Sequence, residues 1–176
     1  MLVHELTRHE SLEVLAHTQL GRLACTRGMQ PYIVPIHFAY QNNCLYSFSM
    51  PGQKIDWMRA NPLVCVEADQ IRREHWATVV AFGRYEELRD TPEFSSERTL
   101  AFNLLRQRAM WWDHGGVKKM PGGTPAAVPI FYRIKIVQIT GRSATAEPGA
   151  PDIRPSTANP AKKSWLHKLL RQVRQR

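Results

Sequence analysis

The sequence predicts a mainly β domain (α+β) in which six short antiparallel strands form a small closed barrel with short flanking helices. Two observations lead to this fold class. Six stretches combine β-branched or aromatic residues with strand-like alternation, and Gly, Pro or Asn residues separate most of them. A flat sheet of this size would leave its edge strands open, whereas a barrel protects them. We therefore expect one barrel domain over residues 1–143.

The predicted strands are separated by turns that the sequence indicates. Arg27–Gln30 joins the first two strands, and Gln41–Asn43 turns the chain from the second strand into the third. Pro35 lies inside the second strand, and because proline has no amide to donate, we expect a sheet edge or a bulge there. The predicted strands cover Gly21–Thr26, Pro31–Tyr40, Leu45–Ser49, Leu63–Ala68, His75–Leu88 and Val128–Thr140.

Three helices are predicted around these strands. Thr7 and Glu10 have the spacing of a capping box at a helix start. Pro62 ends the second helix, because the residue before a proline is disfavoured in helical conformation. Pro92 suits the first turn of the third helix, where its missing amide costs nothing. The predicted helices cover Thr7–His17, Gln53–Ala60 and Thr91–Met110.

The start of the second predicted helix carries a pattern typical of phosphate binding. Lys54 lies in the first helical turn, where free amides and the helix dipole already create positive potential. A cation is unfavourable there unless an anion lies beside it, so the turn is a candidate phosphate site. The alternative is a surface lysine on a connecting helix. The candidate phosphate site consists of Ser47, Ser49, Gly52, Gln53 and Lys54.

The charge and composition of the chain argue against several classes of protein. The net charge is +9, but the first 160 residues hold 18 basic and 15 acidic side chains. Because most of the excess charge, +6 of +9, lies in the last sixteen residues, we expect no specific nucleic-acid partner. The sequence shows no signal peptide, no run of eighteen apolar residues and no C-x-x-C pair among its three cysteines. These features favour a cytoplasmic protein without structural disulfides.

The C-terminal end divides into a predicted linker and a predicted tail. Residues 144–163 are rich in Pro, Ala, Gly and Ser, which cannot build a core, so a flexible linker is expected. Residues 164–176 place apolar side chains on one helical face and basic ones on another. This basic amphipathic tail predicts weak contact with a membrane surface. The alternative is a solvated, mostly disordered tail.

The sequence identifies no catalytic residue. The seven histidines are scattered without the i, i+4 spacing of a metal motif, and no metal site is predicted. Neither a dinucleotide-binding glycine motif nor a P-loop is present. His37 and His114 stay open as residues that could take part in chemistry.

Six short motifs, in this order, resemble the pyridoxamine 5'-phosphate oxidase-like FMN-binding split-barrel superfamily over about residues 5–143. The resemblance implies a split β-barrel that forms a homodimer and holds FMN at the interface. It also implies flavin-dependent oxidation or reduction of a small organic substrate, with NADH or NADPH as a candidate electron donor. The motifs are Pro31–Ile36, Leu45–Ser49, Gly52–Lys54, Asn61–Val64, Trp76–Gly83 and Tyr132–Arg142.

Carried over by position, the resemblance also implies a set of FMN contacts. In the oxidase itself an arginine stands where this chain has Gln53, and its C-terminal Arg and His substrate motif has no counterpart here. Three alternatives therefore stay open: a non-catalytic flavin carrier or sensor, a haem protein, and a protein that uses F420. The implied contacts are Tyr32, Ile33, Val34, Pro35, Ile36, Ser47, Ser49, Gly52, Gln53, Lys54 and, from the other subunit, Thr78.

Overall fold

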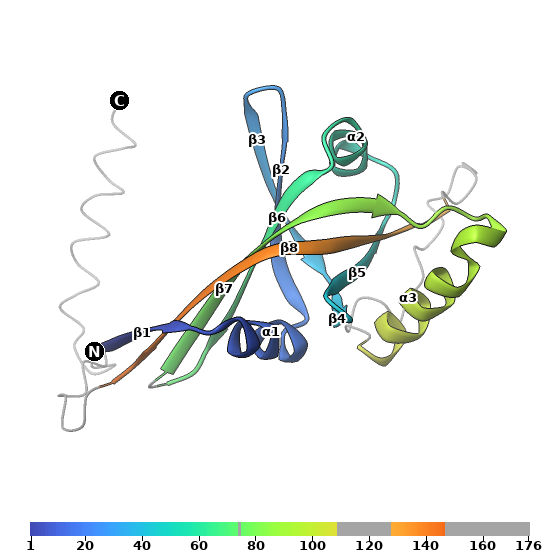
Figure 1. The fold of residues 1–176 in the computed structure, drawn as a ribbon. Coiled ribbons are helices and arrows are strands. Elements are labelled where there is room, and N and C mark those ends of the chain that lie inside the picture. The colour runs from blue at the N-terminus through green and yellow to red at the C-terminus, as the bar shows by residue number, and fades with distance from the viewer. Residues whose placement is uncertain (74, 109–127, 147–176) are drawn as a thin grey trace, which may run out of the picture. The chain divides into compact units, whose positions relative to one another are not determined.

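The computed structural model describes residues 1–73, 75–108 and 128–146 (Figure 1). These residues form one eight-stranded antiparallel sheet with the strand order β3-β2-β6-β7-β8-β5-β4, and β1 pairs with β8 outside this path. None of the helices in this part of the chain is long and apolar enough to cross a membrane. His114, the linker beyond residue 146 and the tail 164–176 lie outside the described residues.

The elements follow one another as short strands, with helices placed at three points of the chain. The strands are β1 Leu2–Leu6, β2 Leu20–Arg27, β3 Gln30–His37, β4 Ala39–Gln41, β5 Cys44–Ser49, β6 Leu63–Ile71, β7 His75–Glu87 and β8 Ile130–Thr145. The helices are α1 Arg8–His17, α2 Gln53–Ala60, the 3-10 helix η1 Pro92–Phe94, and α3 Ser95–Gln107.

The mainly antiparallel β fold is confirmed, but the described residues contain eight strands where six were predicted. β1 escaped prediction because four of its five residues are exposed and leave no apolar alternation to detect. The second predicted strand divides into β3 and β4 at Phe38, whose amide donates to the carbonyl of Gln19 at 2.9 Å. The third predicted helix begins as η1 and becomes α-helical only at Ser95.

Local signals in the sequence are accurate at α1 and at two turns. The side chain of Thr7 caps the amide of Glu10, and the Glu10 carboxylate accepts from the Thr7 amide, which completes the predicted capping box. Asn42 and Asn43 both have positive φ, as a two-residue hairpin turn between β4 and β5 requires. Gly28 also has positive φ, in the turn between β2 and β3.

The core lies on the inner face of the curled sheet. Alternate residues of β2, β6, β7 and β8 are buried there, and α1 and α2 add Leu15, Ile55 and Met58. The two end strands of the path, β3 and β4, are not joined by a backbone ladder in the described chain. The barrel is therefore open at β3, where Pro31 and Pro35 remove two amide donors.

β8 changes its neighbour part-way along its length. β7 pairs with one edge of β8 throughout, whereas the other edge pairs with β5 at Ile130–Lys135 and with β1 at Gly141–Thr145. Between these two segments, Asn43 donates to the carbonyl of Ile136 at 2.7 Å and accepts from its amide at 3.0 Å. The β7–β8 register shifts at the same place, which leaves Val137 as the extra residue of a bulge.

Gly83 faces this bulge and has no room for a side chain. A Cβ at Gly83 would lie 2.6 Å from the carbonyl oxygen of Lys135 and 2.6 Å from Cγ2 of Ile134. We therefore expect Gly83→Ala to lower the free energy of unfolding by about 1–3 kcal/mol, the usual cost of overpacking. Urea unfolding measures this, with Gly52→Ala as a control because a Cβ there meets nothing within 4 Å. Equal stability of the two variants would contradict the close approach.

Candidate functional site

β3 is an edge strand, as the position of Pro35 predicted. Within the described chain it pairs only with β2, and Arg22 lies opposite Pro35. In an antiparallel edge strand, alternate residues direct their backbone groups away from the neighbouring strand. Ile36 is buried, whereas Ile33 is 65% exposed and Pro35 is exposed as well. β3 therefore offers free backbone groups beside an apolar surface.

Ser47 of β5 forms a hydrogen bond to the last residue of β3. Its buried hydroxyl donates to the carbonyl of His37 at 2.7 Å. Ser49, two residues further on, is half-buried and donates to the carbonyl of Met50 at 3.0 Å. Both hydroxyl protons are thus directed to the main chain, so the oxygen lone pairs are what these serines can offer to a ligand.

Lys54 lies at the start of α2, which packs beside β2 and β3. The rings of Tyr32 and Trp57 lie 5.3 Å apart between their centroids, and Asn61 donates to the Thr26 hydroxyl at 2.9 Å. Lys54 is half-buried and makes no hydrogen bond or ion pair with any residue that the structure describes. Burial lowers the pKa of Lys54, and the nearby thiol of Cys25 acts in the opposite direction.

The first turn of α2 also leaves backbone donors available. Gly52 is the N-cap residue and provides no side-chain hydrogen bond to the helix amides. Asp56 is the acidic residue in this turn and pairs with Arg59 at 3.8 Å. The half-buried ammonium group and the uncapped helix amides, which form no pair with a carboxylate of the described chain, are the kind of groups that bind a phosphate. The predicted residues Gly52, Gln53 and Lys54 therefore form a physically consistent anion site.

Cys25 and Tyr132 connect Lys54 with Ser47. Cys25 lies directly opposite Tyr32 in the β2–β3 ladder and interacts electrostatically with both Lys54 and Tyr132. Burial raises the pKa of Tyr132 to about 12, and the Ser47 hydroxyl beside it acts against this rise. The structure thus brings the β3 edge, Ser47 and the α2 start into one neighbourhood.

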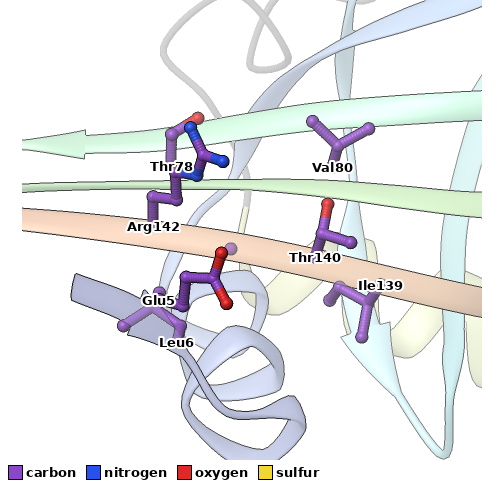
Figure 2. Close-up of a pocket in the computed structure, with 8 residues that line it drawn as sticks. Glu5, Leu6, Thr78, Val80, Ile139, Thr140 and Arg142 are labelled. Atoms are coloured by element: carbon purple, nitrogen blue, oxygen red, sulfur yellow. The ribbon is translucent and has the colours of Figure 1, made fainter. Parts of the chain in front are cut away.

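Thr78, the other predicted contact, lies in a different place. It lines a hollow of about 420 Å³ where β1, β7 and β8 meet, which we call the Arg142 hollow (Figure 2). Arg142 lies directly opposite Thr78 on one side and Glu5 on the other, so the three side chains share one face of the sheet. The residues that define the hollow are Glu5, Leu6, Thr78, Val80, Ile139 and Arg142.

Glu5 and Arg142 are residues that the sequence analysis did not select. They come from opposite ends of the domain, and only the long-range ladder between β1 and β8 places them side by side. The hydroxyl of Thr78 donates to Glu67 at 3.1 Å, and Arg22 pairs with Glu67 and Asp69 at 3.0 and 3.3 Å. Both acids of β6 are therefore already neutralised beside the hollow.

Residues 7–143 match the family model described as pyridoxamine 5'-phosphate oxidase. The chain belongs to this family. An uncharacterized protein of Rhizobium meliloti is 45% identical over 148 residues, which cover 83% of this chain and 98% of that protein. The predicted superfamily membership is thereby confirmed.

Two solved structures that resemble this chain are of proteins described as FAD-binding. A FAD-binding protein from Mesorhizobium loti is 41% identical, with a TM-score of 0.70 over 83% of this chain and 99% of that chain. A FAD-binding protein from Mycobacterium smegmatis is 25% identical, with a TM-score of 0.58 over 83% of this chain and 100% of that chain. Both share the split-barrel fold of this family member.

The free energy of unfolding of the flavin-free protein should be lowered by the burial of the Lys54 ammonium group. Because its pKa is lower in the folded than in the unfolded chain, the unfolded chain binds more protons between the two pKa values. We expect Lys54→Met to be more stable than the wild type at pH 7, and this advantage to shrink as the pH rises through the folded pKa. Urea unfolding in phosphate-free buffer at several pH values measures it.

A matched lysine provides the control for this experiment. Lys135 is exposed, and its ammonium group pairs with Glu86 at 2.9 Å. Lys135→Met should therefore leave stability unchanged or lower it by less than about 1 kcal/mol. A Lys54→Met protein that is less stable than the wild type at pH 7 would show that Lys54 already has a stabilising partner.

Proposed function

We propose that the protein is a flavin-dependent oxidoreductase that binds the FMN unit of its flavin between two copies of the chain. The observation that carries this proposal is the half-buried Lys54, unpaired within the described chain, at the uncapped start of α2 and close to the free edge of β3. The FAD-binding protein of Mesorhizobium loti, at 41% identity, supports a flavin as the ligand.

The available groups fit the parts of a flavin. Lys54 and the first amides of α2 would hold the phosphate, and the residues at Tyr32–Ile36 would place free backbone groups along the ring edge. The exposed side chain of Ile33 would cover apolar ring surface and exclude water. A flavin held there would supply two-electron chemistry, with NADH or NADPH as a donor and a small organic compound as the acceptor.

An exposed apolar surface favours the homodimer. Phe82 is 46% exposed and Val137 is 77% exposed, beside the bulge of β7 and β8, and exposed Leu63 lies on neighbouring β6. Contiguous apolar surface of this kind is typical of an interaction site. A second copy that covers this surface would bring Thr78 of the partner subunit towards the flavin of the first chain.

Flavin binding is tested by the spectrum of the purified protein and by titration with FMN. We expect a yellow protein, or a colourless one that takes up added FMN. Lys54→Ala should weaken FMN binding by about 1.5–3 kcal/mol, which is the range for a hydrogen bond to a charged group and corresponds to about 10–150-fold. Lys135→Ala is the control and should bind as the wild type does. A protein that never takes up flavin would refute the proposal.

Turnover separates an oxidoreductase from a carrier or sensor. An oxidoreductase should be reduced by NADH or NADPH and reoxidised by quinones or nitro compounds in repeated cycles. Stopped-flow absorbance of the flavin band, followed by steady-state assays, measures both steps. Bound flavin with turnover near zero for every donor would favour the carrier.

The proposed dimer is tested by a substitution that places a charged side chain in its interface. Val137→Asp should shift sedimentation at micromolar concentration from the dimer towards the monomer and reduce flavin content, because a buried unpaired carboxylate opposes association. Ile71→Asp is the matched control, since Ile71 is 78% exposed at the end of β6, away from the bulge. A wild-type protein that sediments as a monomer would remove the basis for a shared site.

A further inference from the structure

The Arg142 hollow contains a cation that no residue of the described chain engages. Arg142 is exposed and makes no ion pair or hydrogen bond there, although Glu5 lies directly opposite it in the β1–β8 ladder. The other nearby arginine, Arg22, forms ion pairs with Glu67 and Asp69. The guanidinium of Arg142 is therefore available to an anion from outside the chain.

The hollow forms because β5 and β1 each cover only part of one edge of β8. β5 covers the outer edge of β8 up to Lys135, and β1 covers it only from Gly141 onward. The uncovered stretch of β8 contributes Ile139 and Thr140, and Leu6 closes one end where β1 stops (Figure 2). Its volume of about 420 Å³ lies in the range of about 300–1,000 Å³ that small-molecule sites occupy.

Three kinds of group line the hollow. Arg142 has the planar guanidinium that binds a phosphate through two parallel hydrogen bonds. The carboxylate of Glu5 can accept hydrogen bonds from a pair of ribose hydroxyls. Val80 shares the face of Arg142 and offers an apolar contact for an aromatic base, and Leu6 and Ile139, which also pack against the core, add apolar surface at the edge of the hollow. Together they match a nucleotide better than a simple anion, because a simple anion would leave Glu5 and the apolar side chains without a role.

We propose that the Arg142 hollow binds the adenylate half of FAD, so that the protein uses FAD in preference to FMN. This inference rests on the proposed function, because Thr78 links the hollow to the flavin bound by the other subunit. Lys54 would hold the phosphate that FMN and FAD share, and Arg142 would hold the phosphate that only FAD carries. The hollow thus determines which flavin is selected, whereas the Lys54 site binds the part common to both.

Titration of the flavin-free, full-length protein with FAD and with FMN tests this proposal. The wild type should bind FAD at least tenfold more tightly than FMN. Arg142→Gln should weaken FAD binding about tenfold or more, the effect of losing one charge-assisted phosphate contact, and leave FMN binding within about twofold. Arg142→Lys should recover part of the FAD affinity, and Glu5→Ala should weaken FAD binding alone.

Arg106→Gln is the matched control. Arg106 is an exposed arginine on α3 that also makes no ion pair in the described chain, and it lies outside both the hollow and the apolar surface beside the bulge. Its variant should bind both flavins as the wild type does. Equal weakening of FAD and FMN by Arg142→Gln, or no weakening of either, would overturn the inference while the proposed function stands. A wild-type protein that binds neither flavin would overturn both.

Discussion

The division of one edge of β8 between β5 and β1 is the constraint on which the rest of the structure depends. Asn43, directly before β5, bonds the backbone groups of Ile136 where the β5–β8 pairing stops, and the bulge at Val137 shifts the register with β7 at the same point. Gly83 permits the close approach that this bulge needs. The consequence is an uncovered stretch of β8, and that stretch becomes the floor of the Arg142 hollow.

The same constraint separates two sets of functional groups. Lys54 and the β3 edge lie at one end of the strand order, and β2 and β6 separate them from Thr78 and Arg142 on β7 and β8. Ser47 lies on β5 and pairs with Tyr132, at the opposite end of β8 from Arg142. Strands in a sheet are about 4.7–4.9 Å apart, so β2 and β6 hold Lys54 and the β3 edge several strand widths away from Thr78 and Arg142 within one chain. The proposed dimer would allow one flavin to contact both sets, and the exposed apolar side chains beside the bulge offer a surface for the second copy.

Local chemistry explains what the sequence could predict. The capping box of Thr7 and Glu10, the turn at Asn42–Asn43 and the edge position of Pro35 each depend on residues close together in the chain, and each is confirmed. Lys54 was selected for a local reason too, its place in the first turn of α2. Arg142 and Glu5 could not be selected, because only the long-range β1–β8 register makes them neighbours. β1 was missed for a related reason, since its exposed residues show no strand periodicity.

Flavin stoichiometry in a mixed dimer tests the shared site most directly. Chains carrying Lys54→Ala would be combined with chains carrying Thr78→Tyr, each of which should bind flavin weakly alone. In a mixed dimer, one site would have Lys54 from one chain and Thr78 from the other, so we expect one flavin per mixed dimer with wild-type affinity. The second site would carry both substitutions. The absence of any wild-type site in the mixed dimer would show that the contacts come from one chain, and would contradict this account.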